Sequence, residues 1–172
     1  MKMKTKLLVS LQIFSLIVSS PNVDSSSLLP LIDSTCKQTP FYDLCVSNLQ
    51  SDPRSSTADT NGLGVVVVGK IEAKSAETLN AINGLIKQKP ELSQALNSCA
   101  GKYNAIIKGD VPQATEAFQK NDPKFAEDAA NDAANEADSC EKLFSGRSPI
   151  TSSNTLVNQL SLVAAAIAKL LL

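Results

Sequence analysis

The sequence predicts an all-α protein: an up-down-up-down four-helix bundle that follows a short N-terminal helical hairpin and carries two disulfides. Two observations predict this fold class. Apolar residues recur three and four positions apart in four long stretches with short connections, which is typical of a bundle of amphipathic helices. Four cysteines remain after an N-terminal leader, and an even number of cysteines in a secreted chain indicates disulfides. A length of 172 residues suits one domain behind a processed segment.

The beginning of the chain has the three-part layout of a secretory signal peptide. Three lysines in the first six residues precede an apolar run over residues 7–18, and the small residues Ser19 and Ser20 follow. The run is too short to cross a bilayer, which needs about 20 apolar residues. We therefore expect a signal peptide over residues 1–20, cleaved between about residues 19 and 27.

A short helical hairpin is expected over residues 28–51. Helical patterns on the two sides of Thr39-Pro40 predict two short helices. The polar composition of residues 51–59 then predicts a linker, and the bundle itself is expected over residues 60–172.

Four apolar stripes at helical spacing predict the helices of the bundle. The stripes run, in order, through Val68–Ile86, Leu92–Ile106, Phe125–Phe144 and Leu156–Leu170. The second stripe is interrupted by Gly109 and Pro112 but resumes at Ala114, so we expect one long, kinked helix that ends at about Lys120. The third stripe is rich in alanine, which lets helix backbones approach closely. The valine run over residues 65–68 favours a strand in isolation, and we expect its context to make it helical.

The four cysteines are Cys36, Cys45, Cys99 and Cys140. Four cysteines allow three connectivities. The local pair Cys36–Cys45, which closes across Thr39-Pro40, is the simplest choice and leaves Cys99–Cys140 as the second bridge. A zinc site is the alternative, but the chain has neither a histidine nor the CxxC spacing of common zinc sites, so no metal is expected.

Charge and composition exclude several classes of function. The net charge is −1, and it becomes −4 when the leader lysines are removed and Asp24 is kept, so the chain lacks the basic surface of a nucleic-acid-binding protein. Without histidine there is no Ser-His-Asp or Cys-His arrangement and no ordinary metalloenzyme site. The segment Gly62-Leu63-Gly64 is not completed into a phosphate-binding loop, so no cofactor is expected.

Two further segments have a functional and a plain structural interpretation. Acidic residues over 127–141 could supply paired carboxylates for glycoside hydrolysis, but a solvated helix face is favoured because a small bundle offers no deep cleft. The apolar run over residues 160–172 could be a lipid-anchor signal, but it is short and interrupted by Lys169, so a core helix is favoured. The sequence therefore predicts a protein that is not an enzyme.

The segment from Asn121 to Phe125 carries unusual chemistry for a connection between two bundle helices. Asp122 can cap the N-terminus of the third helix, and Pro123 can take the first helical position, which proline favours. Lys124 then falls in the first turn, where the helix dipole prefers an anion.

This segment resembles the plant invertase inhibitor family, which shares its fold with the pectin methylesterase inhibitors. The resemblance is carried by the run Asp122-Pro123-Lys124-Phe125-Ala126-Glu127-Asp128, by the cysteine spacing and by the stretch Ala133–Phe144. It covers the chain from about Leu28 to Leu172. It implies a four-helix bundle behind a helical hairpin, with the first cysteine joined to the second and the third to the fourth.

The resemblance also implies a partner and a mechanism. Pro123, Lys124 and Phe125, together with Asp122, would enter the active site of a plant acid invertase (β-fructofuranosidase) and cover its sucrose-binding cleft in a 1:1 complex. The free protein is expected to be a monomer, without a membrane anchor after signal cleavage, in the apoplast or cell wall or in the vacuole. Which invertase it meets stays open, and Phe125 could pack either at the rim of the cleft or inward on the bundle.

Two alternatives remain from the sequence. The first is inhibition of pectin methylesterase, although the Pro-Lys-Phe run is not typical of the esterase-directed branch. The second is a helical carrier of small apolar ligands, which would need a sizeable internal pocket that the alanine-rich packing disfavours.

Overall fold

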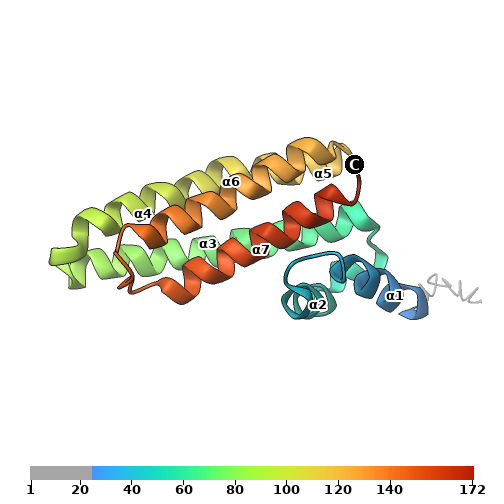
Figure 1. Ribbon diagram of the computed structural model, residues 1–172, viewed down its shortest axis with the longest axis horizontal. Helices are drawn as coiled ribbons and strands as arrows, with labels where there is room; N and C mark the ends of the chain where they lie inside the picture. Colours follow the sequence, from blue (N-terminus) through green and yellow to red (C-terminus); the bar gives the residue numbers. More distant parts are fainter. Residues whose placement is uncertain (1–24) are drawn as a thin grey trace, which may run out of the picture.

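A computed structural model of the protein describes residues 25–172, so the predicted signal peptide lies outside the described residues. Within this range the regular structure is helical throughout. Four long helical segments run side by side as an antiparallel bundle, and a pair of short helices packs beside one half of it (Figure 1). The predicted fold class is therefore confirmed.

The bundle helices have the order that the apolar stripes predict. Their bounds are α3 (Thr60–Gln88), α4 (Ser93–Ala105), α5 (Val111–Gln119), α6 (Pro123–Lys142) and α7 (Thr151–Lys169). The side chain of Asp59 caps α3 by accepting a hydrogen bond from the Gly62 amide at 2.8 Å. The helix ends before Pro90, which begins the short 3₁₀ helix η2 (Pro90–Leu92). The valine run is helical, as expected from its context.

The second bundle segment is continuous from α4 to α5 through a π-helical turn, η3 (Ile106–Asp110). The amide of Val111 bonds to the carbonyl of Ile106, five residues earlier, and Pro112 supplies no amide donor. The wider turn removes the clash that the proline ring would cause in a regular α-helix. The predicted long, interrupted second helix is confirmed, and the π turn is the form that the interruption takes.

The N-terminal hairpin consists of α1 (Ser25–Cys36) and α2 (Tyr42–Gln50). The disulfide Cys36–Cys45 joins the two helices with 5.5 Å between the Cα atoms. Both sulfurs are fully buried. The hairpin packs against α3 and α7 (Figure 1).

The predicted polar linker over residues 51–59 connects the hairpin to the bundle and has more structure than the sequence indicates. It forms the 3₁₀ helix η1 (Pro53–Thr57), which Asp52 caps with its side chain. Asp52 is buried, and its Oδ2 pairs with Arg54 at 2.9 Å and with Lys70 of α3 at 3.0 Å. The hydrogen bond from Arg54 holds the pKa of the Asp52 carboxyl well below its usual range, so the pair persists in acid. The segment attaches the hairpin to the bundle.

Alanines form most of the face through which α6 packs against the bundle. Its buried face consists of Ala126, Ala129, Ala130, Ala133, Ala134, Ala137 and Cys140. Small side chains allow the neighbouring backbones to come close, and the Cα atoms of the Cys99–Cys140 disulfide are only 4.9 Å apart. The C-terminal run forms α7 with a buried face, as expected for a core helix. No helix among residues 25–172 is both long and apolar enough to cross a membrane.

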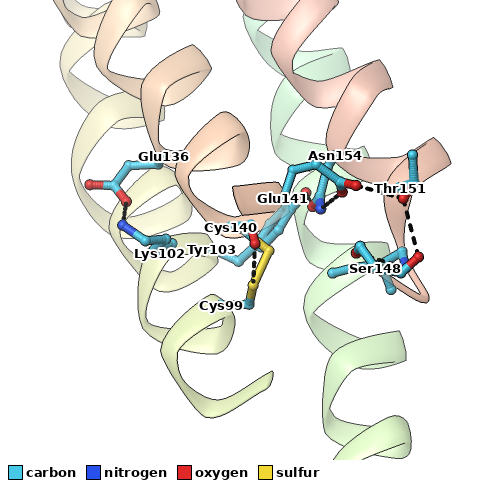
Figure 2. Close-up of a disulfide and its surroundings, with 10 residues drawn as sticks. Cys99, Lys102, Tyr103, Glu136, Cys140, Glu141, Ser148, Thr151 and Asn154 are labelled. Atoms are coloured by element: carbon cyan, nitrogen blue, oxygen red, sulfur yellow. Dashed lines mark hydrogen bonds and ion pairs between the residues drawn. A yellow bond between two sulfur atoms is a disulfide. The ribbon is translucent and has the colours of Figure 1, made fainter. Parts of the chain in front are cut away.

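The acidic residues of α6 are not all simply solvated, which corrects part of the expectation. Figure 2 shows Glu141 accepting hydrogen bonds from Thr151 Oγ1 at 2.7 Å and from Asn154 Nδ2 at 2.6 Å. Asn154 in turn accepts a hydrogen bond from the buried hydroxyl of Tyr103 at 2.8 Å. A network of side chains therefore joins α4, α6 and α7 near the Cys99–Cys140 bridge.

Candidate target-binding turn

The connection between α5 and α6 is a tight turn whose shape is fixed by its own backbone. Asn121 has a φ of 54°, in the left-handed region that asparagine tolerates better than most residues. The Asn121 amide bonds to the carbonyl of Phe118 at 3.2 Å, and the Asp122 amide bonds to that of Ala117 at 2.8 Å. These two bonds form the Schellman motif that ends many helices. The direction in which the chain leaves α5 is thereby set.

The start of α6 has the predicted residues in the predicted positions. Asp122 is the N-cap, and its Oδ1 accepts a hydrogen bond from the Phe125 amide at 3.4 Å. Pro123 occupies the first helical position, where its missing amide donor has no cost. Pro123, Lys124 and Phe125 therefore stand at one end of the bundle on a rigid helix start.

Lys124 is exposed and is held by carboxylates of its own helix. Its Nζ lies 2.7 Å from Asp128 Oδ1 and 3.5 Å from Glu127 Oε2. The hydrogen bond to Asp128, one helical turn further on, raises the pKa of Lys124. The ammonium group is therefore fully charged at any physiological pH. These two acids offset the unfavourable position of a lysine near the positive end of the helix dipole.

Phe125 faces solvent, with 67% of its surface exposed. The third apolar stripe was expected to begin with this side chain, and that part of the prediction is wrong. Its neighbour Ala126 is fully buried and takes the first core position, because the face of α6 that contacts the bundle is the face of its alanines. Aromatic rings are enriched in protein–protein interfaces, so an exposed ring beside a lysine is suited to binding a partner.

A shallow hollow of about 270 Å³ lies beside Phe125 on the side of α5. It is lined by Gln113, Glu116, Ala117, Lys120, Asp122 and Phe125. Glu116 and Lys120 form an ion pair along its border. Sequence reasoning missed the α5 part of this surface; the only signal was the spacing of four between an exposed glutamate and an exposed lysine at the end of that helix.

No candidate catalytic or metal centre accompanies the turn. Among residues 25–172, no group of three or more histidine, cysteine, aspartate or glutamate side chains is arranged to hold a metal ion. What the turn offers is one exposed lysine that pairs within its own helix, one exposed aromatic ring and a hollow next to them. Such a surface suits recognition of another protein.

Comparison with known proteins agrees with this description. A family model described as plant invertase/pectin methylesterase inhibitor matches residues 30–167. The Arabidopsis thaliana protein named cell wall / vacuolar inhibitor of fructosidase 1 is 48% identical over 137 residues, which cover 80% of this chain and 67% of that protein. A pectinesterase inhibitor of Actinidia deliciosa is 30% identical over 148 residues, covering 83% of this chain and 78% of that protein.

The fold is also similar to a solved structure. The crystal structure of mutant form A of a pectin methylesterase inhibitor from Arabidopsis matches with a TM-score of 0.70 at 20% identity, covering 80% of this chain and 95% of that one. At this identity the likeness concerns the fold alone. The relatives named above are inhibitors and not enzymes, in agreement with the prediction of a non-catalytic protein.

Proposed function

Since this chain belongs to the plant invertase/pectin methylesterase inhibitor family, we propose that it inhibits a plant acid invertase by occupying the enzyme's sucrose-binding cleft. The observation that carries the proposal is the exposed Lys124 and Phe125 pair on a capped helix start. Its relative at 48% identity, named as an inhibitor of fructosidase, supports invertase as the class of partner.

The chemistry of the turn suits such a cleft. A retaining glycoside hydrolase carries two carboxylates close together where it holds the scissile bond. The ammonium group of Lys124 is a compact cation that can enter between them in place of the sugar. Pro123 and the capped helix start hold the turn in shape before binding, which lowers the entropy cost of association.

Entering the cleft requires Lys124 to leave Asp128 and Glu127. Lys124 and Asp128 are exposed, Glu127 is half-buried at the longer distance, and ion pairs near the surface contribute only about 0–1 kcal/mol. Leaving these carboxylates therefore costs little, so the pairing of Lys124 within its own helix is no obstacle to a contact with the carboxylates of the enzyme. Once such a contact is shielded from water, removing one partner costs about 2–5 kcal/mol, much of it the penalty of leaving the other charge unpaired.

Phe125 and the hollow beside it form the second part of the proposed surface. With the lysine inside the cleft, the exposed ring contacts the rim, and the hollow lined by Ala117 and Lys120 receives a side chain of the enzyme. The protein is a monomer when free, and one molecule of it binds one molecule of invertase. The signal peptide directs the protein to the apoplast or cell wall or to the vacuole; the relative named for both locations supports this route without separating them.

Inhibition of pectin methylesterase is the second candidate, favoured by the relative at 30% identity and by the shared fold. One experiment separates the two. Purified protein without its leader is titrated into assays of a plant acid invertase and of a plant pectin methylesterase. We expect loss of sucrose hydrolysis at stoichiometric inhibitor and an unchanged esterase rate. Inhibition of the esterase alone would overturn the proposal.

A further inference from the structure

Within the described residues, a side-chain hydrogen bond joins the α5–α6 turn to a third helix, α3. Asn61, in the first turn of α3, donates from Nδ2 to Oδ1 of Asn121 at 2.9 Å. The two residues are 60 positions apart in the sequence. The backbone bonds of the Schellman motif fix the shape of the turn, and the Asn61–Asn121 bond joins it to α3.

A steric contact one helical turn away brings these two residues within reach. Gly64 is buried against the ring of Phe118, and a Cβ at Gly64 would lie 2.3 Å from Cε1 of that ring. Gly64 follows Asn61 by three positions, and Phe118 precedes Asn121 by three positions. Asn61 and Gly64, three apart in α3, lie on the same face of that helix. Asn121 lies just beyond the end of α5, and its amide bonds to the carbonyl of Phe118, so the ring contact and the hydrogen bond are close to each other at the boundary between α3 and α5.

The identities of the two asparagines fit a positioning role better than a stabilising one. Glycine would adopt the left-handed conformation of residue 121 without cost, but it could not accept the bond from α3. Oδ1 of Asn61 is buried and has no hydrogen-bond partner, which is unfavourable for folding. What Asn61 contributes is its donor group, directed at the turn.

We propose that Asn61 and Asn121 are positioning residues that fix the α5–α6 turn relative to α3 and so determine where Lys124 and Phe125 point. This inference rests on the proposed function for its effect on inhibition. Its effect on the turn itself is independent of that function. Lys124 stands three residues from Asn121, at the far side of the N-cap, so a small rotation of the turn displaces its long side chain.

The test compares variants at residues 121 and 61 that keep or remove the hydrogen bond between the turn and α3. Asn121→Gly keeps the left-handed conformation and removes the acceptor, whereas Asn121→Asp keeps an oxygen in the same place. Asn61→Ala removes the donor. Asn97→Ala is the matched control, because Asn97 is exposed on α4 and bonds only to the carbonyl of Ser93 in its own helix.

Two quantities are measured for each variant: the inhibition constant against acid invertase, and amide hydrogen exchange at Asp122 and Phe125. We expect Asn121→Gly and Asn61→Ala to raise both the inhibition constant and the exchange rates about fivefold, the effect of one lost hydrogen bond. Asn121→Asp and Asn97→Ala should stay close to the parent protein. The double variant of Asn61 and Asn121 should be no worse than either single one.

Unchanged exchange in Asn121→Gly, or unchanged inhibition with faster exchange, would overturn the positioning role. Equal losses in Asn121→Gly and Asn121→Asp would also overturn it, because the acceptor would then not matter. Failure of the proposed function is recognised separately: the parent protein would not inhibit invertase, while the exchange rates would still report whether the asparagines hold the turn.

Discussion

The last turn of α6 is bonded to both of its neighbours, whereas the first turn is bonded mainly to itself. At the C-terminal end, Cys140 is joined to α4 by a disulfide and Glu141 accepts two hydrogen bonds from α7 (Figure 2). At the N-terminal end, Lys124 pairs only with carboxylates of its own helix, and Phe125 is exposed. One helix is thus bonded to its neighbours at one end and presents an exposed lysine and an exposed aromatic ring at the other.

A small bundle can thus separate the part of a helix that holds it in place from the part that exposes side chains. The alanine face and the bonded C-terminal end fix the axis of α6, so its N-terminal end can carry exposed charged and aromatic side chains without being flexible. Changes at the two ends should therefore have separate effects: stability at the C-terminal end, and binding at the N-terminal end.

The largest effect is expected from removing the disulfide at the C-terminal end. Replacing Cys99 and Cys140 by alanine opens a loop of 41 residues and should lower the free energy of unfolding by about 4 kcal/mol on the loop-entropy model. Removing the Cys36–Cys45 disulfide, which closes a shorter loop, should lower the free energy of unfolding by less, about 3 kcal/mol. Chemical denaturation measures both. Inhibition at a temperature where the Cys99 and Cys140 variant is folded should be unchanged; a large loss there would contradict the separation.

The next effect is at the N-terminal end. Lys124→Ala should weaken inhibition by about 2 kcal/mol or more, because a cation buried among carboxylates is lost. The stability of this variant should change little, since the ion pairs that Lys124 makes lie near the surface. Lys142→Ala is the matched control, because Lys142 is an exposed lysine of the same helix that pairs with Asp138, four residues before it. Equal inhibition by the Lys124 and Lys142 variants would remove Lys124 from the mechanism.

The smallest effect concerns pH and the π turn between α4 and α5. Burial raises the pKa of Asp110 to about 6, and the nearby carboxylates Asp132 and Glu136 of α6 add to the rise. One of its oxygens is buried without a hydrogen-bond partner. The folded state therefore holds this proton up to a higher pH than the unfolded state, in which the pKa is near 3.8. Asp110 therefore makes the folded state more stable in acid than at neutral pH, and this difference in stability is lost as the pH rises through about 6.

Denaturation of the parent protein and of Asp110→Asn at about pH 5 and about pH 7.5 measures this contribution. We expect the parent to lose about 1 kcal/mol more than the variant over this range, a value reduced by solvent screening of a half-buried group. Equal losses would show that Asp110 does not titrate in this window.

Much of the fold follows from the sequence because it depends on local patterns. The helices follow from the spacing of apolar residues and the proline positions, and the start of α6 follows from Asp122 and Pro123. The direction of Phe125 does not follow from the sequence, because the apolar pattern places a large aromatic side chain in the core. Here the alanines define the buried face instead.

Other features depend on contacts between distant parts of the chain. The sequence assigns Asp52 to a polar linker, because its ion pair with Lys70 of α3 forms only when the chain is folded. The bond between Asn61 and Asn121 depends on how closely Gly64 lets α3 approach Phe118. The hollow beside Phe125 combines side chains of two helices whose relative rotation no pattern in the sequence gives.

In the proposed complex, the turn from Pro123 to Phe125 lies where sucrose would bind. Steady-state rates of an acid invertase, measured over a range of sucrose concentrations at several inhibitor concentrations, test this placement. We expect the apparent KM for sucrose to rise with inhibitor concentration while kcat stays constant. A fall in kcat at unchanged KM would contradict it, because the inhibitor would then bind away from the cleft.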